Sequence, residues 1–181
     1  QYGADAVRWF ILSDSPPEKD VQWSDAGVVS ANKFLQRIWN LNLSIINRKE
    51  VKIEKKVEEK FISEINNFIT RIDNSINNFR FNVSIALFYE IFSFLKVSIN
   101  KNLSNSILRE SIIKIMIVMS PFIPHLANEC LENLKCKNTD RWPVINKSSI
   151  LEEVKLAIQV NGKTRDIISI KKDMSEKETH K

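Results

Sequence analysis

Hydrophobic residues recur at steps of three and four along most of residues 4–134, which is the spacing of one face of an α-helix. The clearest stripe covers about six helical turns. Its members are Val57, Phe61, Ile65, Phe68, Ile69, Ile72, Ile76 and Phe79. Similar but shorter stripes predict further helices at residues 4–12, 31–45, 85–95, 107–119 and about 125–134. Amphipathic helices with short connections favour an antiparallel helix bundle, so the pattern predicts a mostly α fold.

Polar and proline-rich segments separate these predicted helices. Pro16 and Pro17 forbid continuation of the first helix, and Ser24 with Asp25 stands ahead of the second. Asn82 is expected to cap the helix that follows it. The mixed-charge stretch at 48–60 is expected to be a solvated linker that leads into the exposed start of the next helix.

The hydrophobic period changes from 3.6 to two after Trp142 and Pro143. Residues 154–160 and 164–170 alternate apolar and polar side chains, and Asn161-Gly162 lies between them. An Asn-Gly pair between two alternating runs is a strong signal for a β-hairpin. Residues 175–178 (SEKE) fit a capping box, so a helix is expected to start there. Because a lone hairpin is marginally stable in water, this second unit looks incomplete.

The composition is that of a globular chain with a basic surface. Hydrophobic residues make up 43% and charged residues 27%, and 27 Lys and Arg against 22 Asp and Glu give a net charge of +5. A basic surface suits a polyanion such as nucleic acid, although richness in Ile, Lys and Asn also raises the charge without any RNA contact. No run of about 18 apolar residues is seen, so no membrane span is expected. The start, without Met or an apolar leader, indicates a chain that begins inside a longer protein.

Residues that could carry chemistry are few. The three glycines are too far apart for a phosphate-binding loop, and two histidines and two cysteines do not provide a triad or a zinc site. His125 is expected to cap or pack at a helix start, and Cys130 is expected to be a small core residue. We therefore expect no catalytic residue, no metal site and no cofactor within this chain.

Several segments resemble one family in order and spacing. They are residues 2–8 (YGADAVR), 15–20 (SPPEKD), 23–28 (WSDAGV), 32–39 (NKFLQRIW), 81–86 (FNVSIA), 120–129 (SPFIPHLANE), 142–143 (WP) and 159–165 (QVNGKTR). The first is similar to a segment that follows the catalytic domain of class I aminoacyl-tRNA synthetases, and the whole series resembles leucyl-tRNA synthetase. Asp166 departs from the family, which usually has glycine after the arginine of the hairpin.

The resemblance implies the anticodon-binding bundle of a class Ia synthetase, followed by a β-hairpin that opens a small, truncated α/β domain. Residues 1–22 would be a junction helix and loop after the catalytic domain, 23–140 the bundle, and 141–181 a linker with the incomplete C-terminal domain. The whole enzyme would attach leucine to tRNA(Leu) with ATP and magnesium in the cytoplasm. Its catalytic and editing sites lie upstream in the family, so tRNA(Leu) and those domains of the same chain are the implied partners, with no membrane.

The candidate RNA-binding residues are basic or polar side chains of the bundle and the hairpin: Lys33, Arg37, Arg80, Asn161, Lys163 and Arg165. Lys33 and Arg37 are four apart, so they share a helix face and could both meet phosphates. Arg8 is expected to pair with an acid, Trp39 to lie in the core, and Trp23 to fill a domain junction.

Three other interpretations stay open from the sequence. The chain could be the same portion of an isoleucyl-, valyl- or methionyl-tRNA synthetase, against which residues 16–28 argue. It could also be a stand-alone helical adaptor, which would show a sizeable apolar patch to a partner protein. Finally, the positive charge could reflect composition alone.

Overall fold

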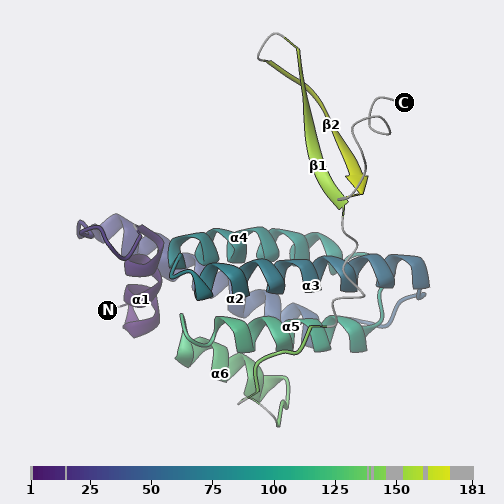
Figure 1. The fold of residues 1–181 in the computed structure, drawn as a ribbon. Coiled ribbons are helices and arrows are strands. Elements are labelled where there is room, and N and C mark those ends of the chain that lie inside the picture. The colour runs from purple at the N-terminus through teal and green to yellow at the C-terminus, as the bar shows by residue number, and fades with distance from the viewer. Residues whose placement is uncertain are drawn as a thin grey trace.

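The computed structural model of the chain describes residues 2–14, 16–137, 139, 141–145, 153–160 and 163–171, the last two segments by their backbone alone. In this part of the chain six helices precede two strands (Figure 1). The helices are α1 (Gly3–Asp14), α2 (Asp25–Ile46), α3 (Lys55–Asn77), α4 (Phe81–Ser98), α5 (Asn105–Met119) and α6 (Pro124–Asn133). The predicted mostly α bundle is confirmed.

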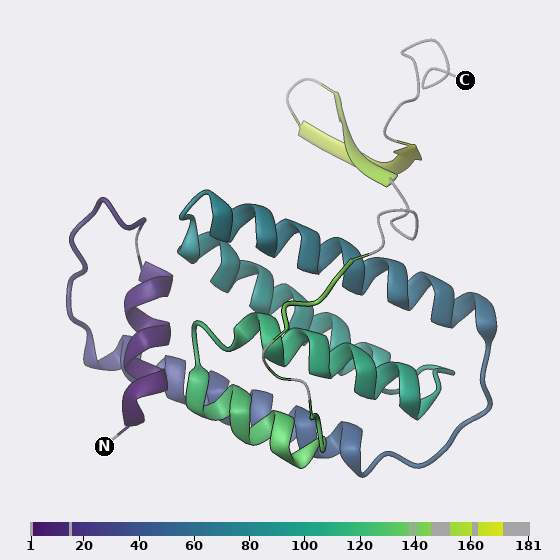
Figure 2. The ribbon, with the colours of Figure 1, turned by 60° about the horizontal axis from the view of Figure 1, so that its bottom comes forward.

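The helices α2 to α5 form the long body of the bundle, and α1 runs across one of its ends (Figure 2). α3 and α4 pack as neighbours, and α1 contacts both α2 and α4. α6 folds back onto α5 and also contacts α1 and α2. This arrangement brings residues from the two ends of the bundle sequence, on α1 and α6, next to one another.

Tight packing fixes α1 against α2. Ser24 caps α2, and its Oγ accepts a hydrogen bond from the Gly27 amide at 3.1 Å. A Cβ at Gly27 would lie 2.5 Å from an atom of the Phe10 ring, so a larger residue at that point would have to displace this ring. Trp9 is 1% exposed and packs against the rings of Phe34 and Phe88 with centroid distances of 5.2 and 5.8 Å. The apolar stripes therefore meet in one core.

The turn between α3 and α4 differs from the prediction. Phe79 adopts a left-handed conformation with φ of 55°, its amide donates to the Ile76 carbonyl, and the Arg80 amide donates to the Ser75 carbonyl at 2.8 Å. These two bonds form the Schellman ending of α3. Because this turn already reverses the chain, α4 begins at Phe81 with Arg80 at its N-cap, and the prediction that Asn82 is the cap is wrong.

A half-buried network closes the end of the bundle where α2 stops and α4 meets α5. The guanidinium of Arg48 donates to the carbonyls of Ile99, Lys101 and Leu103 at 2.7, 2.6 and 2.8 Å, and to Asn105 Oδ1 at 2.6 Å. Glu58 accepts a hydrogen bond from the Ser104 amide at 2.8 Å. The predicted solvated linker is therefore wrong for Arg48, because these carbonyls at the end of α4 and in the loop lack helical partners.

The helix α4 has the length and composition of a membrane span, with a mean hydropathy of 1.3 over 18 residues. This differs from the expectation that the chain has no such segment. Its apolar face packs against α1 and α3 in the bundle core, which explains why it is so apolar. One helix of this kind is a common feature of helical cores and weak evidence for a membrane.

The strands β1 (Glu153–Val160) and β2 (Lys163–Lys171) pair in antiparallel register, from Glu153 opposite Lys171 to Val160 opposite Lys163. The register is irregular between Ile158 and Gln159. Asn161 and Gly162, which were expected to form the turn, lie outside the described residues, as does the predicted helix start at 175–178. The small α/β domain that the hairpin was expected to open stays a prediction.

Candidate nucleic-acid interface

The predicted pair of cations on α2 lies on the surface, where both Lys33 and Arg37 are exposed. The Arg37 guanidinium lies over the Phe92 ring, 4.8 Å from its centroid, and 6.0 Å from that of Phe34. Neither cation has a carboxylate partner in the part of the chain that the structure describes. The ring below Arg37 restricts the side chain but leaves its N–H groups for an outside anion.

Tyr89 extends this surface from α4. Its ring lies 4.0 Å from that of Phe34, its hydroxyl accepts a hydrogen bond from Trp9 Nε1 at 3.2 Å, and it is 41% exposed. The α2–α4 platform, formed by Lys33, Arg37 and Tyr89, thus combines two free cations with a fixed aromatic residue. The sequence places Tyr89 in the apolar stripe of the helix predicted at residues 85–95, because helical spacing does not distinguish a tyrosine at the edge of a core from one inside it.

Arg80 lies at the exposed turn that joins α3 to α4. Its carbonyl is used by the Ser84 amide, whereas its guanidinium forms no hydrogen bond or ion pair within the described residues. No hydrogen bond, ion pair or cation–π contact joins Arg80 to the α2–α4 platform in that same part of the chain. The structure therefore presents the candidate cations of the bundle as two separate groups.

The hairpin candidates are placed only in part. Lys163 is the first residue of β2 and Arg165 is two residues further along, while Asn161 lies outside the described residues. Because only the backbone of the strands is described, the three residues stay predicted RNA contacts.

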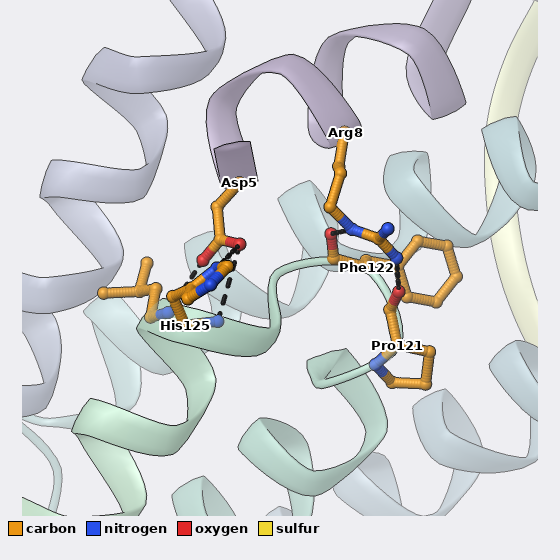
Figure 3. A network of polar contacts seen from close by, with 6 residues as sticks. Asp5, Arg8, Pro121, Phe122 and His125 are labelled. Carbon is orange, nitrogen blue, oxygen red and sulfur yellow. Dashed lines mark hydrogen bonds and ion pairs between the residues drawn. The ribbon is translucent and has the colours of Figure 1, made fainter. Parts of the chain in front are cut away.

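A second polar cluster joins α1 to the loop before α6 (Figure 3). Asp5 is buried, and its carboxylate accepts hydrogen bonds from the Leu126 amide at 2.7 Å and from the His125 amide at 3.4 Å. His125 Nδ1 lies 2.9 Å from the same carboxylate. Asp5 thereby caps α6 from another helix, which supports the capping or packing role expected for His125.

Arg8 completes this cluster one turn further along α1. Its Nε donates to the Phe122 carbonyl at 3.2 Å, and its Nη2 donates to the Pro121 carbonyl (Figure 3). The prediction that Arg8 pairs with an acid is wrong, because the nearby acid, Asp5, is used by the start of α6. The role is structural, and it ties residues 2–8 to residues 120–129.

The remaining candidates have structural environments. Cys130 is fully buried, and burial, with the neighbouring charge of Glu129 as a smaller cause, raises the pKa of its thiol to about 12. Trp39 is partly buried against the core, while Trp23 is 62% exposed and donates to Asp25 Oδ1 at 2.8 Å. Among the described residues, no three His, Cys, Asp or Glu side chains gather as a metal site would require.

Comparison with known proteins gives the class of the chain. The family model described as "Anticodon-binding domain of tRNA ligase" matches residues 58–180. The chain belongs to this family of tRNA ligase domains.

Its relatives are leucine–tRNA ligases, as the resemblance in the sequence indicated. The chain is 39% identical over 194 residues to that of Thermosipho melanesiensis, covering 100% of this chain and 24% of the relative. It is 37% identical over 187 residues to that of Prochlorococcus marinus subsp. pastoris, covering 98% and 22%. The chain therefore spans about a quarter of the length of the curated relatives it matches.

A solved structure shares the fold. It is a ternary complex described as LeuRS-tRNA-LeuAMS from Agrobacterium radiobacter K84, with a TM-score of 0.79 and 23% identity. The match covers 99% of this chain and 25% of the solved one. At this identity the likeness establishes the arrangement of the helices and leaves the RNA-contacting residues to be tested.

Proposed function

We propose that the chain is the tRNA-binding portion of a leucine–tRNA ligase, which attaches leucine to tRNA(Leu) with ATP and magnesium. The observation that carries the proposal is the match to leucine–tRNA ligases along the full length of the chain. The catalytic and editing domains would be supplied by other parts of a longer polypeptide in the cytoplasm. The paired strands would then open the small C-terminal α/β domain.

In this proposal the bundle contributes binding energy at a distance from the reacting carbonyl. Contacts to the body of the tRNA hold its acceptor end in place, which is an orientation effect on the chemical step. The α2–α4 platform has cations for phosphates, so we assign it to backbone and shape recognition. Arg80 and the basic tip of the hairpin, with Lys163 and Arg165, would add further contacts.

The structure bears on the adaptor alternative as well. A protein-binding adaptor would leave an apolar stripe for its partner, whereas the stripes of α2, α3, α4 and α5 are buried against one another. The relatives quoted above are leucine enzymes, which favours leucine over isoleucine, valine or methionine as the amino acid.

The test uses the full-length enzyme with Lys33→Glu and Arg37→Glu combined. The double variant should bind the tRNA(Leu) transcript at least about tenfold more weakly, and the slope of log affinity against log salt should fall by about 2. ATP–pyrophosphate exchange with leucine should be unchanged, because the adenylate forms without tRNA contacts to the bundle.

A matched control carries the same charge change elsewhere on the bundle. Lys56 and Lys60 on α3 are also exposed and four residues apart. Lys56→Glu with Lys60→Glu therefore makes the same change in net charge at a different place on the surface. An equal loss of tRNA affinity in both pairs would mean that only the net charge matters. Loss of the exchange reaction in the Lys33 and Arg37 pair would indicate a folding role and contradict the proposal.

A further inference from the structure

The turn between α3 and α4 places a phenylalanine where helices usually end with glycine or asparagine. Phe79 occupies the left-handed position of the Schellman turn with φ of 55°. A side chain with a Cβ is disfavoured in this conformation, and a bulky one there is an outlier. The local fold would be satisfied better by glycine, so the ring of Phe79 is not explained by the turn that carries it.

The ring of Phe79 is also not explained by the core. It is 67% exposed, which makes it the most exposed aromatic side chain in the part of the chain whose side chains are described. Its ring contact is with Phe81, at a centroid distance of 5.9 Å and an interplanar angle of 78°. Phe81 in turn packs at 6.2 Å against buried Phe122. A fixed aromatic neighbour therefore supports a ring that faces solvent.

The segment that carries the ring contains one cation and several amides. Residues 74–84 contain Arg80 and no acidic residue, and Asn74, Asn77 and Asn78 are exposed in the same stretch. The Arg80 guanidinium forms no hydrogen bond or ion pair among the described residues. The turn also opens α4, whose N-terminal end carries the positive end of the helix dipole. These charges complement a polyanion.

We propose that Phe79 is a stacking platform for an unpaired base of the bound tRNA, with Arg80 contacting the phosphate of the same or the next nucleotide. Aromatic rings and arginine side by side bind unstacked bases, since every base offers a face and every nucleotide a phosphate. This inference rests on the proposed tRNA-binding function. It adds a contact to an unpaired nucleotide, whereas the α2–α4 platform contacts the backbone.

The test compares stability with tRNA affinity in the full-length enzyme. Phe79→Gly removes the ring and relieves the left-handed strain, so the thermal midpoint should stay equal or rise. The affinity for the tRNA(Leu) transcript should fall between about fivefold and about 150-fold, the range for loss of one stacked base. A variant that is as stable as the parent yet binds less tRNA cannot owe its defect to misfolding.

Two further variants at the same position separate stacking from apolar docking. Phe79→Tyr keeps the aromatic face and should keep the affinity, whereas Phe79→Leu keeps apolar bulk without the face and should lose most of it. Arg80→Gln should lower the slope of log affinity against log salt by about 1. Val97→Ala, at a 61% exposed apolar residue on the last turn of α4, is the control and should change nothing.

Two results would overturn the stacking platform. In one, Phe79→Gly binds the tRNA as tightly as the parent; in the other, Phe79→Leu binds as well as Phe79→Tyr, which would indicate docking against another protein surface. If the Lys33 and Arg37 pair still weakens binding in either case, the proposed tRNA-binding function stands and only the stacking contact is lost. If neither set of variants changes tRNA affinity, the proposed function itself fails.

Discussion

The two ends of the bundle are closed by the same combination of side chains, an arginine with a carboxylate, acting on different loops. At the end where α4 meets α5, Arg48 satisfies loop carbonyls and Glu58 accepts the amide of Ser104. At the end where α5 meets α6, Arg8 satisfies loop carbonyls and Asp5 accepts the first amides of α6. In both cases the guanidinium donates to carbonyls that follow the end of one helix. The carboxylate accepts from amides at the start of the next helix.

The two closures differ in how deeply they lie and in how many groups they serve. Arg48 is half-buried and reaches four acceptors, while Arg8 is exposed and reaches two. For the carboxylates, the second end has the more buried group with more partners. Asp5 is buried and accepts from two amides, whereas Glu58 is half-buried and accepts from one. We infer that the arginine contributes more to the free energy of unfolding at the first end, and that the carboxylate contributes more at the second.

The largest expected effect follows removal of Arg48. Arg48→Ala leaves three carbonyls and one amide oxygen without their donor, so the free energy of unfolding should fall by about 3 kcal/mol. Urea unfolding of the chain, followed by helical circular dichroism, measures this loss. Arg48→Lys keeps the charge but not the planar array of donors, and it should recover less than half of the loss. A loss below about 0.5 kcal/mol for Arg48→Ala would contradict the inference that this arginine stabilises the end where α4 meets α5.

A smaller loss is expected at the other end. Asp5→Ala deletes the cap of α6 and should lower the free energy of unfolding by about 2 kcal/mol in the same urea experiment. The His125 side chain is 77% exposed, so His125→Ala should cost less than about 0.5 kcal/mol even though its ring contacts Asp5. Equal losses for the two variants would show that the contact between Asp5 and the His125 ring, and not the capping of amides, stabilises this end.

Thiol labelling distinguishes local opening of the second end from global unfolding. Cys136 is partly exposed and should react with an aromatic disulfide reagent at pH 8 well before Cys130 on α6. Arg8→Ala should raise the labelling rate of Cys130 about tenfold, as expected for a local loss of about 1.4 kcal/mol. Arg48→Ala should raise the labelling rate of Cys130 only through global unfolding. If the two variants raised this rate equally for the same loss in free energy of unfolding, the two ends of the bundle would not open independently.

The same thiol gives a pH dependence with a defined sign. Cys130 holds its proton in the folded chain up to a pKa of about 12, whereas the unfolded chain releases it near the ordinary value of 9.0. This contribution to the free energy of unfolding is therefore fully present below pH 9 and is lost as the pH rises toward 12. Cys130→Ala should abolish this part of the alkaline decline in stability.

Local sequence signals predicted the helices and the start of α2, because these features depend on residues that are close in sequence. The periodic stripes placed the helices because side chains three and four apart share a face, and Ser24 stands at the start of α2 as its position suggested. The bundle followed from these signals, and its family followed from the blocks between residues 2 and 165 that resemble leucyl-tRNA synthetase. None of this required knowledge of how distant segments meet.

Side chains that act across the fold were assigned incorrectly or missed. Arg48 was placed in a solvated linker, yet its acceptors lie 51 to 57 residues away and leave no mark on the local pattern. Arg8 was expected to meet an acid, but its acceptors are carbonyls 113 and 114 residues away. Phe79 was counted with the core stripe of α3 because its spacing fits, although the left-handed turn carries it out into solvent.

The sequence separations of the two closures have a consequence for the order in which the chain folds as it is synthesised. Arg48 can complete its contacts once the chain has been made as far as Asn105. Asp5 waits for Leu126, a separation of 121 residues, before its contacts exist. Since contacts of long separation form only after the intervening chain is available, α1 can pack on α2 and α4 early, whereas its polar contacts to the start of α6 form only after nearly the whole bundle has been made.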